Sequence, residues 1–273
     1  MQKEVTMEYL IINGERVKVD ECNIFEKIKN SPIYEVVRVI EGKEQFINDH
    51  IERMFSSFKL LNYHNQYTQE EIISFARICI EANNILDNNI KLLAVELENN
   101  EKVFMVYPIE SYYPPDEVYK EGIKTILFKH TRTNPNAKVQ QLDYKTSVTK
   151  AIKDSQSYEA LLINEEGYIL EGSRSNLFYV IENNVFTAPA SKVLLGITRK
   201  HIINLIKDLG LNLIEKELHV DDLKDVDGIF VSGTSIGVLP IKFVDNIIID
   251  SADNDLIVKI LREYNKITGK ILG

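Results

Sequence analysis

The sequence predicts an α+β fold, in which strands and helices mix without the regular strand–helix–strand alternation of a doubly wound sheet. Two observations support this class. Short β-branched and aromatic runs that end at turn residues indicate strands, and apolar residues at three- and four-residue spacing indicate helices. Both kinds of segment occur in each half of the 273-residue chain.

The first half is predicted to contain hairpins and two capped helices. Asn13-Gly14 supplies the positive φ angles of a tight turn between two strands. Asp49 with Glu52, and Thr68 with Glu71, resemble capping boxes that open two helices. The expected strands are 10–12, 16–19, 33–40, 45–47, 92–96 and 103–107.

A cluster of turn residues separates the two halves. Tyr112-Tyr113-Pro114-Pro115-Asp116 interrupts regular structure, because proline cannot donate a backbone hydrogen bond to a neighbouring strand. We expect a smaller N-terminal domain at 1–113, a linker at 114–122 and a larger C-terminal domain at 123–273.

The second half is predicted to mix strands with three helices. Gly167 and the Asn183-Asn184 pair supply turns between strands, and Gly210 ends the helix that begins after Gly196. The expected strands are 123–128, 160–163, 168–171, 177–181, 185–187 and 228–232, and the other expected helices are 146–155 and 255–267.

Composition disfavours several function classes. The net charge of −9 argues against nucleic-acid binding, because phosphates select basic surfaces. Cys22 and Cys79 form neither a disulfide framework nor a metal-ligand pattern, which favours the reducing cytoplasm. The first residues lack the apolar run of a signal peptide, and no window reaches the roughly 18 apolar residues of a membrane helix. We expect no metal site and no membrane partner.

Three segments could bind an anion such as phosphate. Gly196-Ile197-Thr198 opens a helix, whose first amides lack internal acceptors and whose dipole adds about half a positive charge. Gly233-Thr234-Ser235 ends a strand with hydroxyls and exposed amides, and Arg53 could contact a phosphate through two N–H groups. The simpler interpretations are a helix cap, a plain turn and a solvated arginine. No glycine-rich nucleotide loop occurs in the sequence.

Lys138 and Glu171 are candidates for covalent and proton chemistry. A lysine attacks an aldehyde only as the neutral amine, which burial and nearby cations promote. Glu171 ends an apolar strand, where a carboxylate is unfavourable unless paired, and opposite a pyridine nitrogen it would keep that nitrogen protonated. Most lysines are surface charges and a strand-end glutamate can point into water, so both interpretations stay open.

Several motifs occur in an order that resembles the class IV (fold-type IV) pyridoxal-phosphate enzymes: branched-chain and D-amino-acid aminotransferases and aminodeoxychorismate lyase. The resemblance spans residues 33–240. The motifs are Ile33-Tyr34-Glu35-Val36-Val37, His50-Ile51-Glu52-Arg53, Tyr158-Glu159-Ala160-Leu161-Leu162, Glu171-Gly172-Ser173-Arg174-Ser175-Asn176-Leu177-Phe178, Leu195-Gly196-Ile197-Thr198-Arg199, Val231-Ser232-Gly233-Thr234 and Leu239-Pro240-Ile241. Together they imply a two-domain fold like that of D-amino-acid aminotransferase, with pyridoxal 5'-phosphate as cofactor, and a homodimer.

The resemblance also implies which lysine reacts. Lys138, in the C-terminal domain, would form the Schiff base and later move the α-proton of the substrate, because its spacing to Glu159 and Glu171 matches the lyase-like and D-amino-acid-like members of the family. Lys145 competes for this role but is closer to both glutamates. Tyr144 is out of register with the tyrosine that binds the cofactor in branched-chain members, so its role stays open.

The other roles follow from the same motifs. Glu171 would bond the pyridine nitrogen, Leu194 would pack under the ring and Tyr34 would face the substrate. The residues expected to hold the phosphate are Arg53, the amides of Ile197 and Thr198, and Thr234.

The implied activity is amino transfer between a branched-chain-like amino acid and a 2-oxo acid. The alternative is the lyase reaction, which releases pyruvate and 4-aminobenzoate, and a third possibility is a cofactor-binding protein without turnover. Residues 97–102 replace the Arg-x-His that binds substrate carboxylate in D-amino-acid aminotransferases. The Arg-Gly-rich loop of many lyases and branched-chain enzymes is also missing.

Overall fold

The computed structural model describes residues 4–29, 31–132, 134–140 and 142–269. The chain divides into two compact units, Met1–Tyr112 with Ala137–Leu142, and Tyr113–Asn136 with Asp143–Gly273. The expected linker lies within the second unit and contains helix α3 (Asp116–Glu121). Lys138, expected in the C-terminal domain, lies in the first unit, because the segment around it pairs with a strand there.

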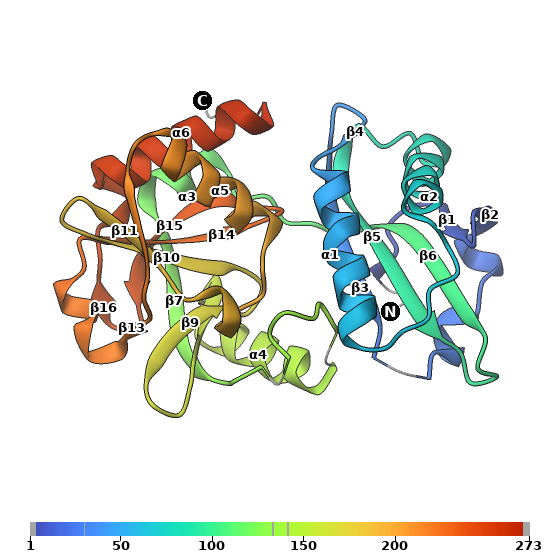
Figure 1. Cartoon of the computed structure of the whole chain (residues 1–273), viewed down its shortest axis with the longest axis horizontal. Coiled ribbons are helices and arrows are strands. Elements are labelled where there is room, and N and C mark those ends of the chain that lie inside the picture. The colour runs from blue at the N-terminus through green and yellow to red at the C-terminus, as the bar shows by residue number, and fades with distance from the viewer. Residues whose placement is uncertain (1–3, 30, 133, 141, 270–273) are drawn as a thin grey trace. The chain divides into compact units, whose positions relative to one another are not determined.

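The first unit is built on an antiparallel sheet with the strand order β2-β1-β6-β5-β3-β4 (Figure 1). Asn13 and Gly14 adopt φ angles of 53° and 92° between β1 and β2, which confirms the predicted hairpin. The strands are β1 (Tyr9–Ile12), β2 (Glu15–Lys18), β3 (Ile33–Ile40), β4 (Lys43–Glu44), β5 (Asp87–Glu96) and β6 (Lys102–Ile109).

Both faces of this sheet are covered. Helices α1 (Ile47–Leu60) and α2 (Gln69–Ala82) pack on one face, where Ile90 and Leu92 of β5 enter their core. Leu93 and Val95 of the same strand point to the other face and pack with Phe25. Because neighbouring residues of a strand point to opposite faces, the buried run 92–95 of β5 is apolar on both faces.

Helix α2 begins as its sequence predicts. The Thr68 hydroxyl accepts a hydrogen bond from the Glu71 amide at 3.2 Å, and the Glu71 carboxylate accepts one from the Thr68 amide at 2.7 Å. These reciprocal bonds confirm the capping box and satisfy two amides that have no partner within the helix.

The start of α1 differs from the prediction. The helix begins at Ile47, after Phe46 with a left-handed φ of 53°, and no side chain caps it. The expected capping box of Asp49 and Glu52 is therefore wrong, and Asp49 lies in the first turn, where its charge complements the helix dipole. The strand expected at 45–47 is also wrong, since the turn after β4 leads directly into α1.

The second unit contains a mixed sheet with the strand order β12-β11-β10-β14-β15-β7-β8-β9-β13, and β16 pairs with β15. An additional pairing of β9 with β10 joins Glu171 to Asn176 and closes the strands from β10 to β9 into a barrel (Figure 1). The strands are β7 (Ile123–Lys129), β8 (Glu159–Ile163), β9 (Tyr168–Gly172), β10 (Asn176–Ile181), β11 (Asn184–Thr187), β12 (Asn212–Glu215), β13 (Leu218–His219), β14 (Gly228–Gly233), β15 (Gly237–Val244) and β16 (Ile247–Ile248).

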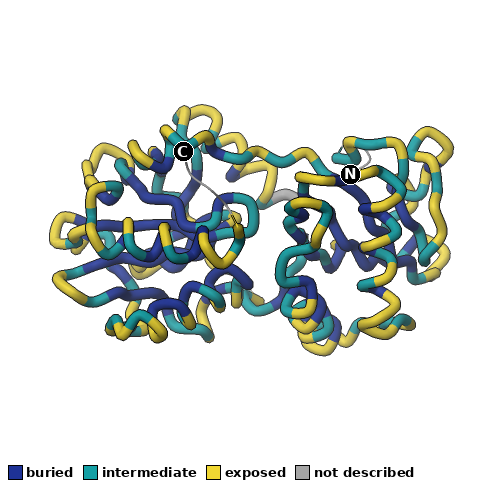
Figure 2. Tube along the Cα trace, turned by 90° about the horizontal axis from the view of Figure 1, so that it is seen from above, coloured by how far each residue is buried: buried dark blue, intermediate teal, exposed yellow. Residues whose placement is uncertain are grey.

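Three longer helices belong to this part of the chain. Helix α5 (Ile197–Asp208) contacts β14, and α6 (Asp255–Thr268), capped by Asn254, contacts β15. Helix α4 (Leu142–Asp154) begins earlier than the expected 146. Short 3₁₀ helices in the described residues of both units are Val19–Glu21, Ile24–Lys27, Ala190–Lys192, Val220–Asp225 and Ser251–Asp253. Figure 2 shows buried strands and exposed connecting loops. Among the described helices, none combines the length and apolar character needed to span a bilayer.

A stacked aromatic pair gives the first testable prediction. Phe178 and Phe230 are partners on β10 and β14, both 0% exposed, with ring centroids 4.9 Å apart. Phe230→Ala should reduce the free energy of unfolding by about 3–5 kcal/mol, because it leaves a cavity. Urea denaturation followed by circular dichroism measures the loss. Ile248→Ala, at a residue 63% exposed, is the control. A loss as small as that of the control would contradict the prediction.

Candidate active site

Helix α1 carries a buried polar stripe. His50, Arg53 and Ser57 follow at the spacing that places side chains on one helix face, beside the apolar face of Ile51 and Met54. His50 is 2% and Ser57 0% exposed, and the Arg53 side chain is 9% exposed. Buried polar groups are costly unless hydrogen-bonded, so this stripe requires partners.

Glu35 is a partner of two of these side chains. Strand β3 places it on the same face as Ile33 and Val37, so its carboxylate enters an apolar core. Arg53 donates from Nε to Oε1 at 2.7 Å and from Nη2 to Oε2 at 2.5 Å. His50 Nδ1 lies 2.8 Å from Oε2. The two arginine bonds form the bidentate pair that suits a planar guanidinium and a carboxylate.

The surroundings set the charges of this cluster. Burial raises the pKa of Glu35, but Arg53 and His50 outweigh burial and lower it to about 2. Burial lowers the pKa of His50, and the nearby cations Arg53 and Lys138 add to this, against the opposing effect of Glu35. Glu35 is therefore ionised and His50 neutral, so Nδ1 carries the hydrogen donated to the carboxylate.

The segment around Lys138 attaches to the same region from two sides. The Tyr34 amide donates to the Lys138 carbonyl at 3.1 Å, and Val139 forms a bridge with Ile33 of β3. The Lys138 amide donates to Ser57 Oγ on α1 at 3.2 Å. Lys138 is therefore held by its backbone between a strand and a helix of the first unit.

The side chain of Lys138 faces a predicted substrate residue. Its Nζ lies 4.8 Å from the centroid of the Tyr34 ring, and Lys138 is half-buried. The competing candidate, Lys145, is exposed on α4. Lys138, Tyr34 and Arg53 thus occur together in the first unit, next to His50.

A second ammonium group lies beside Tyr34, and the sequence interpretation missed it. Lys91 of β5 is 4% exposed, and its Nζ is 5.1 Å from the centroid of the Tyr34 ring. It donates to Glu4 Oε2 at 2.8 Å and to Gln140 Oε1 at 2.7 Å. Gln140 follows Lys138 by two residues. Gln140 Nε2 has no hydrogen-bond partner among the described residues.

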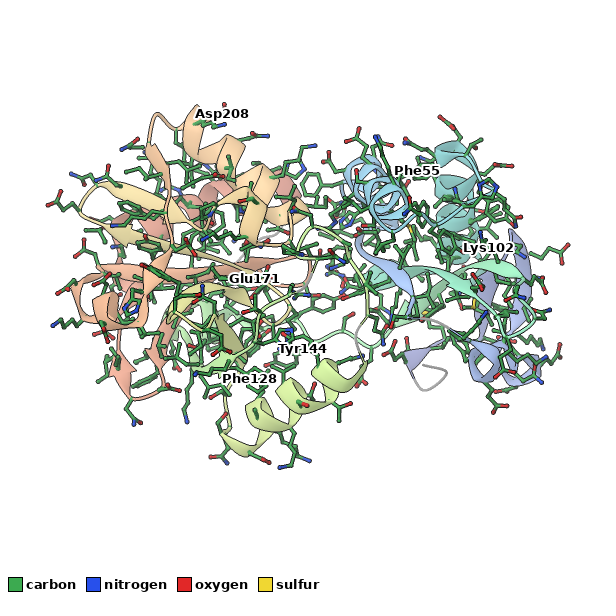
Figure 3. The ribbon with its side chains drawn as sticks, turned by 60° about the horizontal axis from the view of Figure 1, so that its bottom comes forward. Phe55, Lys102, Phe128, Tyr144, Glu171 and Asp208 are labelled. Atoms are coloured by element: carbon green, nitrogen blue, oxygen red, sulfur yellow. The ribbon has the colours of Figure 1, made fainter. Side chains whose placement is uncertain are left out.

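In the second unit, Glu171 lies at the pairing that closes the barrel (Figure 3). It is 3% exposed. Its Oε1 accepts from Arg132 Nε at 2.7 Å, and its Oε2 accepts from the Leu194 amide at 3.1 Å and from Asn176 Nδ2 at 3.3 Å. These charged and polar donors are what a buried carboxylate needs.

Tyr144, whose role the sequence leaves open, contacts this group through Arg132. The guanidinium carbon of Arg132 lies 5.8 Å from the centroid of the Tyr144 ring. The His130 ring stacks on Tyr144 with centroids 4.0 Å apart, and burial followed by Arg132 lowers the pKa of His130. Figure 3 labels Tyr144 and Glu171. Tyr144 therefore helps to pack the arginine that binds Glu171.

A second buried carboxylate fixes the turn after Glu171. Glu159, 1% exposed at the start of β8, accepts hydrogen bonds from the amide and hydroxyl of Ser173 and from the hydroxyl of Ser175. A Cβ at Gly172 would lie 2.1 Å from Ser175 Oγ. The run from Glu171 to Asn176 therefore needs glycine and two serines to wrap around Glu159.

The predicted phosphate segment opens α5. Gly196 is the N-cap, no side chain caps the helix, and its first turn contains no acidic residue. Thr198 is buried and its side chain hydrogen-bonds Tyr264, whose pKa burial raises to about 12. The amides of Ile197 and Thr198 thus lie at the positive end of the helix dipole, which can attract an anion. Thr234, also in the second unit, is half-buried after β14.

The predicted residues divide between the two units. The first holds Arg53, Lys138 and Tyr34; the second holds Glu171, Leu194, Ile197, Thr198 and Thr234. The sequence interpretation gave no role of their own to Glu35, Lys91, Arg132 and Glu159. Glu35 left a signal, because the alternation of β3 places it on the apolar face. In the described residues, no cluster of three or more His, Cys, Asp or Glu side chains could hold a metal.

Comparison with known proteins identifies the family of this chain. The family model described as amino-transferase class IV matches residues 32–244. The chain belongs to the class IV aminotransferases. A probable branched-chain-amino-acid aminotransferase of Rickettsia bellii is 30% identical over 281 alignment positions, which cover 97% of each chain. D-alanine aminotransferase of Bacillus licheniformis is 24% identical over 86% of this chain and 88% of its own.

A solved class IV structure shows the same fold. The branched-chain amino acid aminotransferase of Escherichia coli has a TM-score of 0.86 to this chain, at 22% identity, over 97% of this chain and 94% of that one. This confirms the predicted two-domain fold-type IV architecture. Class IV aminotransferases depend on pyridoxal phosphate, so this chain is a pyridoxal-phosphate-dependent aminotransferase acting on amino and oxo acids. Amino transfer is favoured over the lyase reaction.

The described residues fit this cofactor. The buried carboxylate of Glu171, with an arginine and two further donors, can face a ring nitrogen. The uncapped start of α5 and the fixed guanidinium of Arg53 can each bind phosphate oxygens. Lys138 supplies an amine beside an aromatic ring.

The lowered pKa of Glu35 predicts a specific acid sensitivity. Its stabilising effect is complete above about pH 4.5 and is lost as the pH falls to about 2, because protonation breaks the pair with Arg53. The loss for this group is roughly 3 kcal/mol. The free energy of unfolding, measured by urea titration from about pH 6 to about pH 3, should fall more steeply for the parent than for Glu35→Gln. Parallel curves would contradict the prediction.

Proposed function

We propose that this class IV aminotransferase moves an amino group between a branched-chain-like amino acid and a 2-oxo acid, with Lys138 as the catalytic amine. The observation that carries the assignment is the placement of Lys138, whose backbone is bound to both β3 and α1 while its amine faces Tyr34. The exposure of Lys145 supports the choice. The names of relatives such as that of Rickettsia bellii support the substrate class.

Each remaining residue has a proposed task. When bound, pyridoxal phosphate withdraws electrons and makes the α-proton of the substrate acidic. Lys138 would take and return that proton as general base and acid. Glu171, oriented by its donors, would keep the pyridine nitrogen protonated. The phosphate would be held by Arg53, the amides of Ile197 and Thr198, and Thr234.

We further propose that Lys91 binds the second carboxylate of a dicarboxylate substrate such as 2-oxoglutarate. Its ammonium lies 5.1 Å and that of Lys138 lies 4.8 Å from the centroid of the same Tyr34 ring, so both amines border the side chain that is proposed to face the substrate. Glu4 and Gln140 supply the oxygens that Lys91 contacts in the described structure, and a substrate carboxylate offers the same acceptor chemistry.

Assembly and location are also proposals. We propose a homodimer, which the resemblance to the family supports, and analytical ultracentrifugation tests it. We propose a cytoplasmic location, because Cys22 and Cys79 are buried and form no disulfide, as is usual in a reducing compartment.

Substitution of the two lysines tests the proposed catalytic amine. Lys138→Ala should abolish the visible absorbance of the covalently held cofactor and lower amino transfer to 2-oxoglutarate at least about a hundredfold, because the proton carrier is lost. Lys145→Ala, at an exposed position of α4, should keep both the visible absorbance and the amino transfer. The same assays measure pyruvate and 4-aminobenzoate. Release of these products without amino transfer, or an unchanged Lys138→Ala spectrum, would overturn the proposal.

Kinetics of a Lys91 variant test the substrate contact. Lys91→Met should raise KM for the dicarboxylate 2-oxoglutarate about tenfold, because a charge-assisted hydrogen bond is lost. KM for a branched-chain 2-oxo acid with one carboxylate should change less. Lys29→Met, which removes a partly exposed ion pair with Glu96 in the same unit, is the matched control. Equal KM values for parent and Lys91→Met would exclude the contact.

A further inference from the structure

Glu35 and His50 are buried ionisable residues to which the proposed reaction gives no task. Glu35 is 0% and His50 2% exposed. The alternation of β3 would place an apolar side chain at position 35, and an apolar residue there would avoid the cost of burying a carboxylate. The charge at this position is therefore unfavourable for the core taken alone.

We propose that Glu35 is a positioning residue, which fixes the guanidinium of Arg53 in the orientation that binds the cofactor phosphate. This inference rests on the proposed assignment of Arg53 to the phosphate. Glu35 itself would touch neither cofactor nor substrate; it would act through Arg53.

The geometry of the pair supports this role. A guanidinium presents five N–H groups in one plane, and Glu35 receives one from Nε and one from Nη2. Two bonds to one carboxylate fix both the position and the plane of the guanidinium, which a single bond would not. The adjoining edge of the same plane, formed by Nη1 and Nη2, is then oriented in one direction.

His50 fixes the carboxylate in turn. Its Nδ1 donates to Oε2, the oxygen that also accepts from Arg53 Nη2. Helix α1 places His50 and Arg53 one turn apart, so both reach Glu35 from the same side. Because burial keeps His50 neutral, it orients Glu35 without adding a second positive charge to the cluster.

The charge of Glu35, considered without its orienting role, predicts the opposite effect on phosphate binding by Arg53. Its carboxylate neutralises Arg53 and should therefore weaken the attraction of the guanidinium for an anion. If orientation matters more than net charge, removing the carboxylate weakens phosphate binding. If charge matters more, removing it strengthens phosphate binding. The sign of one measured change separates the two effects.

The experiment compares two ligands that differ only in the phosphate. Full-length protein freed of cofactor is titrated with pyridoxal phosphate and with pyridoxal, and dissociation constants are read from absorbance. Glu35→Gln should weaken binding of pyridoxal phosphate about tenfold and that of pyridoxal by less than about threefold. Unchanged or tighter binding of pyridoxal phosphate overturns the inference. Equal weakening of both ligands also overturns it, because that indicates general structural damage.

If Glu35→Gln does not fold, a second variant tests the inference. Arg53→Lys keeps the charge but cannot form a planar two-bond pair, so it should lose the preference for pyridoxal phosphate as Arg53→Ala does. A parent-like preference in Arg53→Lys overturns the inference. Glu44→Gln, which removes the ion pair with Arg77 in the same unit, is the matched control and should bind both ligands like the parent.

The alanine variant separates this inference from the assignment on which it rests. If Arg53→Ala keeps the parent preference for pyridoxal phosphate, Arg53 does not bind the phosphate and the proposed site is wrong. If Arg53→Ala loses that preference and Glu35→Gln keeps it, Arg53 binds the phosphate and only the positioning role of Glu35 fails.

Discussion

The candidate site depends on one constraint: its buried carboxylates need hydrogen-bond donors or positive charges beside them. Glu35, Glu159 and Glu171 are 0%, 1% and 3% exposed, and each lies on a strand. A carboxylate in such a position is tolerated only with charged or hydrogen-bonding partners. Each recruits donors from another segment of its own unit: Glu35 from α1, Glu159 from the turn after β9, and Glu171 from residue Leu194 and from Arg132. Satisfying the charge therefore fixes the segments that carry the predicted cofactor residues.

Local signals predicted most of the regular structure, and the failures have local causes. The hairpin at Asn13-Gly14 and the capping box at Thr68 depend on residues adjacent in sequence, and both occur. Strand β15 is absent from the predicted strands, and its Pro240, which lacks an amide, disfavours a central strand. It nevertheless pairs with β14 on one side and β7 on the other. The start of α1 was misplaced because Phe46, not a polar cap, ends the preceding turn in a left-handed conformation.

Only the parts of the candidate site that belong to motifs or to local patterns in the sequence were predictable. Lys138 and Glu171 were identified from motifs that resemble a family, not from their surroundings. Glu35 could have been found from the alternation of β3 alone. Arg132 and Lys91 could not, because their partners are distant in sequence: Arg132 binds Glu171, 39 residues away, and Lys91 binds Gln140, 49 residues away. Such contacts exist only once the sheets have formed.

Asn176 shows how the second unit holds two parts of its candidate site at a fixed separation. Its Nδ2 donates to Glu171 and, at 2.8 Å, to the carbonyl of Leu194. A Cβ at Gly196 would lie only 2.1 Å from Asn176 Oδ1, so glycine is required for the start of α5 to approach this closely. The carboxylate of Glu171 and the start of α5 are thus joined through one side chain. A rigid ligand with a basic nitrogen at one end and a phosphate at the other gains from such preorganisation, because the fold has already met the cost of orienting both contacts.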